Sequence, residues 1–259
     1  MIFQFHLYGF FVGLGIATAL LLFEKVAEKE KLGLPINQLT VWMIIPGIVG
    51  ARVYHLVTDW QLYTQASFWD LIAVWNGGIG IIGALIGGVI GLWCFLYVQK
   101  KVEKIWLIGD MCALSLPFGQ AIGRWGNFFN QELYGVATSL PWGIHISAEH
   151  LLPGLDLNAR YHPLFLYESL AMVSFGVLIW WMYRKKALGD VGTGKYLAVY
   201  GMYYAVIRFL LEFLRIESSR GSVFPLSILT TAQWMMVGVF VVSTVLFYWQ
   251  HKNEQKKNV

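Results

Sequence analysis

The sequence predicts an all-α polytopic membrane protein, and three observations lead to this class. Of the 259 residues, 57% are hydrophobic and only 13% are charged, which sets the chain apart from an ordinary soluble domain. Several apolar runs reach the roughly 18–20 residues that cross a hydrocarbon core of about 30 Å. Lys and Arg are concentrated in alternate loops between these runs, as they are on the cytoplasmic side of proteins that cross a membrane several times.

About seven transmembrane helices are expected, within one integral-membrane domain that covers residues 1–259. We expect the N-terminus outside, because no Lys or Arg precedes the first span and Lys25, Lys29 and Lys31 follow it. Seven spans then place the C-terminus inside. The predicted spans are 3–23, 38–57, 78–98, 105–123, 164–183, 194–214 and 226–249.

The third predicted span contains a glycine at every fourth position, at Gly83, Gly87 and Gly91. Small residues at this spacing let membrane helices approach closely. We therefore interpret these glycines as a helix-packing face.

The positive charges divide by residue type. Thirteen of the 19 basic residues fall in loops that the predicted topology places inside, and nearly all of these are lysines. The remaining six are all arginines, although intramembrane arginine costs roughly 2.5–3.5 kcal/mol at a span's centre. Because a guanidinium binds phosphate or carboxylate in a bidentate manner, we predict an anion-binding cavity that opens toward the outer leaflet. The six are Arg52, Arg124, Arg160, Arg208, Arg215 and Arg220.

The densest group of hydrogen-bonding side chains lies at the end of the fourth span, in GRWGNFFNQELYG, residues 123–135. Arg124 and Asn127 are three residues apart and would face the same way on a helical turn. Asn130 and Glu132 follow them. The simpler alternative is a capped helix end with a tight loop. The next segment, 136–162, is too long for a plain connector, and we expect it to form a small outer head.

The motif HPLFLYE, His162 to Glu168, opens the fifth span. Pro163 suits the first turn of a helix. Tyr167 and Glu168 lie about one turn inside, where a carboxylate in an apolar helix needs a partner such as one of the arginines.

The sixth span carries a polar stripe at steps of four, four, four and three residues, which places its members on one helix face. Glu212 can reach Arg208 and Arg215 along this helix. A structural ladder of salt bridges is the alternative to a functional site. The members are Tyr200, Tyr204, Arg208, Glu212 and Arg215.

The two cysteines, Cys94 and Cys112, fall in apolar surroundings without metal-ligand spacing, so we expect small core residues. The sequence shows no nucleotide-binding loop and no zinc motif. We predict no metal, no organic cofactor and no nucleic-acid partner.

Together these motifs resemble the signature of the bacterial prolipoprotein diacylglyceryl transferases. Besides residues 123–135, the likeness includes HLYG with Tyr8, GAR at Gly50–Arg52, WNGG at Trp75–Gly78, HPLFLYE and RFLLEFLR, in the right order over most of the chain. The resemblance implies a multi-pass enzyme of the bacterial inner membrane with its active site toward the periplasm. It would move diacylglycerol from phosphatidylglycerol, a membrane lipid, to the lipobox cysteine that follows the signal peptide of a prolipoprotein. The products would be a thioether and glycerol phosphate.

The resemblance and the chemistry of the side chains together suggest roles for residues. Arg124 and Arg208 match two arginines considered essential in the family, and we expect them to hold the departing phosphate. Tyr8, Glu132 and His162 are the candidates for accepting the thiol proton. The residues expected to bind substrate are Arg124, Asn127, Gly135, Arg208, Glu212, Arg215, Asn130, Arg52, Tyr167 and Glu168.

One position departs from the family pattern. Many members have a histidine in the third-span motif, where this chain reads GIIGALIG with Ile82. The base therefore lies elsewhere, or no base of fixed identity is needed. The departure leaves open a catalytically inactive lipid-binding paralogue. Intramembrane arginines also leave open a lipid or anion transporter, although the sequence shows no internal repeat.

Overall fold

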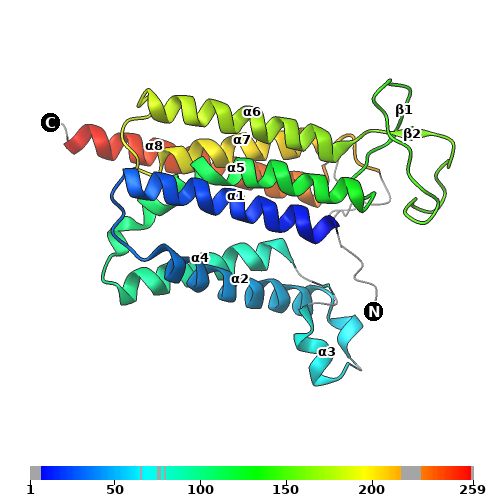
Figure 1. Cartoon of the computed structure of the whole chain (residues 1–259), viewed down its shortest axis with the longest axis horizontal. Helices are drawn as coiled ribbons and strands as arrows, with labels where there is room; N and C mark the ends of the chain where they lie inside the picture. Colours follow the sequence, from blue (N-terminus) through cyan, green and yellow to red (C-terminus); the bar gives the residue numbers. More distant parts are fainter. Residues whose placement is uncertain (1–6, 65, 75–76, 79, 217–228, 258–259) are drawn as a thin grey trace. The chain divides into compact units, whose positions relative to one another are not determined.

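A computed structural model describes residues 7–64, 66–74, 77–78, 80–216 and 229–257 (Figure 1). The chain forms two compact units: unit 1 comprises Met1–Glu30 and Trp106–Val259, and unit 2 comprises Lys31–Ile105. A single domain over residues 1–259 stays a prediction. The first two residues of the WNGG motif and Arg220 lie outside the described residues.

Unit 1 is built from five long helices whose axes run along one common direction in Figure 1. Helices α1 and α5 pack through glycines: a Cβ on Gly15 would lie 2.5 Å from the Gly119 carbonyl oxygen. Helices α5 and α6 are joined by Ser169, whose hydroxyl donates to the Ala121 carbonyl at 2.8 Å. The bounds are α1 Leu7–Lys29, α5 Ile105–Phe129, α6 Leu164–Arg184, α7 Lys195–Glu212 and α8 Thr231–Lys257.

The start of α7 is fixed by a buried carboxylate from α5. Asp110 is fully buried, and its two oxygens accept the backbone N–H groups of Gly192, Gly194 and Leu197, each at 2.9 Å. A negative charge at a helix N-terminus satisfies N–H groups that have no partner within the helix. Lys195 next to it binds Glu254 of α8. The end of α7 that lies furthest from Arg208 is thus tied to two neighbouring helices.

Unit 2 consists of two long helices, α2 (Ile36–Thr58) and α4 (Ile81–Val98), which lie side by side in Figure 1. The glycines of the third predicted span form the contact, since a Cβ on Gly83 would collide with the Gly50 carbonyl. The predicted packing face is therefore confirmed. The short helices are η1 (Trp60–Tyr63) and α3 (Phe68–Ile72) between the long pair, and η3 (Val102–Lys104) after it.

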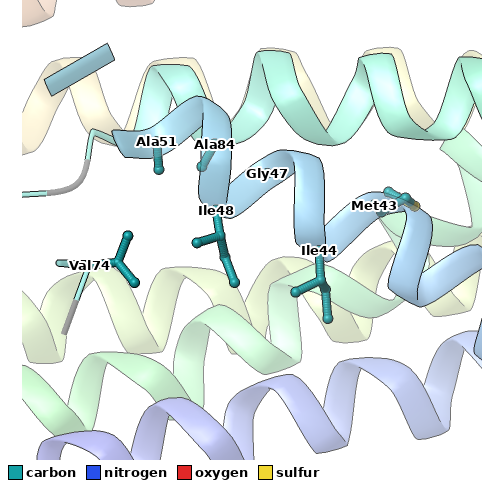
Figure 2. Close-up of a pocket in the computed structure, with 7 residues that line it drawn as sticks. All are labelled: Met43, Ile44, Gly47, Ile48, Ala51, Val74 and Ala84. Carbon is teal, nitrogen blue, oxygen red and sulfur yellow. The ribbon is translucent and has the colours of Figure 1, made fainter. Parts of the chain in front are cut away.

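An apolar hollow of about 480 Å³ opens on α2 (Figure 2). Ile44 and Ile48 project from one side of α2 toward it, and Val74 follows the short helix α3. Its lining contains no polar side chain.

Six helices of the described chain are long and apolar enough to cross a membrane: α1, α2, α4, α5 with the preceding η3, α6 and α8. The predicted all-α polytopic class is confirmed. The predicted span 194–214 does form helix α7, but three charged residues, Lys195, Arg208 and Glu212, keep it out of this set. Its role as a seventh span, and the sides on which the two chain ends lie, stay predictions.

The head segment, residues 136–162, packs around a small core that it shares with Tyr134 and Ile216, and it contains the two strands of the described chain. Strand β1 (Ala137–Thr138) pairs antiparallel with β2 (Arg160–Tyr161), and both lie beyond the ends of α5 and α6 in Figure 1. The core groups Tyr134, Ile146, Tyr161 and Ile216. Burial raises the pKa of Tyr161, whose hydroxyl donates to the Asp156 carbonyl at 2.6 Å. This two-stranded sheet was not predicted from the sequence.

The glycine contact between α2 and α4 predicts that alanine destabilises the protein at one glycine of α4 and not at another. Gly83→Ala is expected to lower the melting temperature of the purified protein in detergent, because its methyl group would collide with backbone and overpacking costs about 1–3 kcal/mol. Gly88→Ala is the matched control, since its Cβ would lie 3.7 Å from the Met43 carbonyl and alanine favours a helix. Equal melting temperatures in a fluorimetric scan would contradict the packing role.

Candidate functional site

The first element of the site is an ion pair between α5 and α6. Arg124 Nη2 lies 2.5 Å from Glu168 Oε1, and the Glu168 side chain is only 3% exposed. The Arg124 side chain is 28% exposed, so one end of the pair reaches open space. The expectation that Glu168 needs an arginine partner is confirmed. A buried carboxylate with this partner fixes the direction of the guanidinium.

Asn127 links Arg124 to the loop that follows α5. Its Oδ1 accepts from Arg124 Nη1 at 3.4 Å, and its Nδ2 donates to Glu132 Oε1 at 2.7 Å. The shared facing of Arg124 and Asn127 that the spacing predicts is thus present. Glu132 itself is exposed, and both its neighbours, Gln131 and Leu133, have positive φ, at 50° and 58°. Such backbone is rare for residues other than glycine and is found mainly where geometry is imposed by surrounding structure.

The second arginine cluster lies at the end of α7. The Glu212 carboxylate is 2% exposed, and its Oε2 lies 3.2 Å from Arg208 Nη2 and 3.6 Å from Arg215 Nη1. Its other oxygen accepts from the Thr230 hydroxyl at 3.3 Å, just before α8. One buried carboxylate therefore forms ion pairs with two guanidinium groups, as the stripe on α7 predicts.

Tyr204 is within electrostatic reach of both clusters. It lies on α7 one turn before Arg208, and Glu168, Arg124 and Arg208 all act electrostatically on its hydroxyl. The two predicted essential arginines, which come from α5 and α7, thus act on the same phenol. Three guanidinium groups face two buried carboxylates across these clusters, and the third carboxylate, Glu132, is exposed.

Gly135 positions Arg215 through backbone contacts. Its N–H donates to the His162 carbonyl at 2.8 Å, and it forms a bridge with Arg215. A Cβ at this position would collide with the Leu214 carbonyl. The backbones of the central stretch, the head and the end of α7 therefore approach so closely that only glycine fits.

The hydroxyl of Tyr167 bridges two side chains of the head. It accepts from Trp142 Nε1 at 2.8 Å and lies 3.0 Å from His162 Nδ1. Because indole is only a donor, the hydrogen of Tyr167 is available for Nδ1. A phenol oxygen can also accept a second N–H, so this contact is compatible with either histidine tautomer. The role of His162 as base stays a prediction.

Tyr8 and Asn130 lie at the rim of the central stretch. Tyr8, near the start of α1, packs on α5, where a Cβ on Gly126 would lie 3.1 Å from its ring. Tyr8 is 40% exposed. Asn130 is exposed and donates its backbone N–H to the Gly126 carbonyl at 3.1 Å.

Arg52 belongs to unit 2 and binds the connection between α2 and α4. Its guanidinium donates to the carbonyls of Asp70, Leu71, Gly77 and Gly78 at 2.5–2.9 Å, and it is 7% exposed. Four of its five N–H groups are thereby engaged. These contacts give Arg52 a structural task, and its predicted role in substrate binding stays a prediction.

Sequence reasoning did not select Tyr204, Trp142 or Thr230 as site residues. Tyr204 stood in the polar stripe of α7, so its spacing from Arg208 could have identified it. Trp142 lies in the head segment and Thr230 in the predicted span 226–249, and only the folded chain brings them to Tyr167 and Glu212.

The tight backbone contact at Gly135 predicts a local effect of added volume. Gly135→Ala is expected to speed hydrogen–deuterium exchange in residues 134–162, because the strand contacts to His162 and Leu214 must separate. Gly123→Ala is the control in the same motif, since its Cβ would meet nothing within 4 Å. Unchanged exchange in the Gly135 variant would contradict the assigned contact.

Comparison with known proteins agrees with this geometry. The family model described as prolipoprotein diacylglyceryl transferase matches residues 1–249. A phosphatidylglycerol–prolipoprotein diacylglyceryl transferase of Gloeobacter violaceus is 34% identical over 251 residues, which are 96% of this chain and 90% of that protein. The enzyme of the same name from Thermosynechococcus vestitus is 37% identical over 82% of this chain and 77% of its own length. This chain, a multi-pass membrane protein, therefore belongs to the prolipoprotein diacylglyceryl transferase family.

Proposed function

We propose that this chain transfers the diacylglyceryl group of phosphatidylglycerol to the lipobox cysteine of prolipoproteins. The names of its relatives include both substrates, phosphatidylglycerol and prolipoprotein. The site offers arginine side chains that can bind the phosphate of the lipid. The observation that carries the proposal is the pairing of Arg124 with the buried Glu168 and of Arg208 with the buried Glu212, which leaves both guanidinium groups partly exposed.

In the proposed reaction, the cysteine sulfur attacks the glyceryl carbon that bears the phosphate. A carbon–sulfur bond forms, the carbon–oxygen bond breaks, and glycerol phosphate leaves with the electron pair. A free thiol has a pKa near 8.5, so some thiolate exists already at neutral pH. The larger need is to stabilise the charge that grows on the phosphate, and preorganised donors in a site poor in water do this well.

Arg124 and Arg208 are the proposed phosphate ligands. Both retain exposed surface, at 28% and 16% of their side chains, while their partners Glu168 and Glu212 are almost fully buried. The carboxylates thus bind each guanidinium on its buried side, and the N–H groups on its exposed side are the proposed donors to the phosphate. Arg215 adds positive charge at the same carboxylate, and Asn127 orients Arg124 or holds the glycerol head.

The thiol proton passes to Tyr8, Glu132 or His162 in this proposal. Among these, Glu132 is exposed, carries a carboxylate and is held by Asn127 next to Arg124. Gly135, Asn130 and Tyr167 shape the same rim. Because Ile82 replaces the histidine common in the family, the reaction proceeds without an imidazole at that position.

The acyl chains are proposed to lie between helices on an apolar surface. A hollow of about 240 Å³ between α7 and α8 is lined by Ala205 and Phe209, which flank Arg208 on α7, and by Phe240 of α8. We place the enzyme in the bacterial inner membrane with this site toward the periplasm, where a translocated signal peptide presents its cysteine.

The direct test supplies purified protein with phosphatidylglycerol and a lipobox peptide, and measures peptide mass. A gain of one diacylglyceryl group on the cysteine, with release of glycerol phosphate, supports the enzyme. Intact lipid binding without mass gain would identify an inactive lipid-binding paralogue. Flux of anion or lipid across liposomes without a thioether product would identify a transporter.

Arg208→Lys is expected to lower kcat/KM by about 100-fold or more, because an ammonium cannot replace a bidentate fork and one lost donor of this kind costs about 3–4 kcal/mol. Arg160→Lys in the head is the matched control, since this arginine is exposed. Near-normal turnover of Arg208→Lys would count against phosphate recognition by this guanidinium.

Glu168→Gln is expected to lower kcat/KM about tenfold, a loss of about 1.4 kcal/mol in transition-state stabilisation, because the amide keeps the volume but releases Arg124. The exposed Glu149→Gln of the head is the control. In a double-mutant cycle, Glu168→Gln should add little to the loss caused by Arg124→Ala. Full additivity would show that Glu168 acts independently of Arg124.

A further inference from the structure

The connection between α2 and α4 exposes a group of large apolar side chains that the proposed reaction does not use. We call this group the aromatic arm. Its exposed fractions range from 41% to 73%. The members are Trp60, Leu62, Phe68, Trp69 and Ile72.

We propose that the aromatic arm is an interfacial anchor that inserts into the glycerol and carbonyl layer of the membrane leaflet next to it. Its position supports this occupant. The arm begins two residues after Thr58, the end of α2, and α4 begins at Ile81; both helices are apolar and long enough to cross a membrane. The connection must therefore lie at a membrane surface.

The apolar surface of the arm is continuous with that of the two long helices. Val57 in the last turn of α2 is 74% exposed, and Ile81 at the start of α4 is 73% exposed. The lipid-facing surface of a span thus runs directly into the exposed side chains of the arm. Tryptophan is enriched at this depth, because its ring is apolar and its N–H is polar.

The arm is held in a defined shape, as an anchor requires. Ser67 and Asp70 form a capping box at α3, and the hydrogen bonds from Ser67 lower the pKa of Asp70. Arg52 donates to the Asp70 and Leu71 carbonyls and lies 5.1 Å from the centre of the Tyr63 ring. Exposure of the apolar side chains is therefore imposed by a buried arginine and a helix cap.

The charge of the arm distinguishes hydrophobic insertion from electrostatic attachment. Residues 59–72 contain two aspartates and no Lys or Arg. Attraction to anionic headgroups needs basic side chains, so it cannot hold this segment at the surface. Insertion by apolar area alone predicts membrane contact that does not depend on anionic lipid.

Nitroxide labels test the proposal. In a background carrying Cys94→Ala and Cys112→Ala, single labels are introduced through Leu62→Cys, Phe68→Cys and Trp69→Cys, and the full-length protein is placed in phosphatidylcholine vesicles with or without phosphatidylglycerol. Collision rates with lipid-soluble oxygen and with a water-soluble nickel chelate are compared. The controls are Gln61→Cys in the same connection and Asp156→Cys in the head, both exposed.

Labels on the arm are expected to show an oxygen-to-nickel collision ratio several times that of the Asp156→Cys label, equally in both vesicle types. A ratio like that of the Asp156→Cys label at all three positions would overturn the proposal. Shielding from both reagents would also overturn it, because the arm would then be covered by protein. A requirement for phosphatidylglycerol would replace insertion by headgroup recognition. A variant is compared only if its melting temperature matches that of the cysteine-free background. Because three positions are labelled, the test can still be read if one variant misfolds.

Discussion

The cost of keeping guanidinium groups among apolar helices governs the arrangement of this protein. An unpaired arginine there is expensive, and so is an unpaired carboxylate. The chain meets both costs at once by pairing Arg124 with Glu168 and by placing Glu212 between Arg208 and Arg215. Because the carboxylates are more deeply buried than their partners, the positive ends of these pairs are the ones that remain accessible. The same pairing that makes the arginines tolerable also aims them, and an anion is the complement that this surface lacks.

Close backbone approach is the second requirement, and glycine provides it. Gly15 and Gly119 bring α1 against α5, Gly50 and Gly83 bring α2 against α4, and Gly135 brings the head against the end of α7. The last contact bears on chemistry, because it fixes the chain that carries Arg215. The Asp110 cap at the other end of α7 serves the same purpose. With both ends tied, the helix that carries Tyr204, Arg208 and Glu212 has little freedom to slide or turn.

Much of this could be predicted from the sequence because the relevant signals are local. Apolar length gives the spans, and steps of three and four residues give the α7 stripe and the pairing of Arg124 with Asn127. The Arg124–Glu168 pair could be anticipated in kind, since an intramembrane carboxylate needs a cation. What escaped depends on segments distant in sequence: the bridge from Trp142 through Tyr167 to His162, the contact of Thr230 with Glu212, and the sheet of the head. Arg52 illustrates the same limit, because residue type alone does not distinguish an arginine that binds ligand from one that donates to four carbonyls.

The left-handed backbone at Gln131 and Leu133 has a consequence for how this fold can change. This conformation is strained for side chains larger than glycine, so it lowers the free energy of unfolding while it fixes the position of Glu132. Glycine at either position would remove the strain and make the loop that carries the Glu132 carboxylate more mobile. Selection for stability would therefore favour glycine at these two positions, whereas selection for catalysis would favour residues that keep the loop rigid.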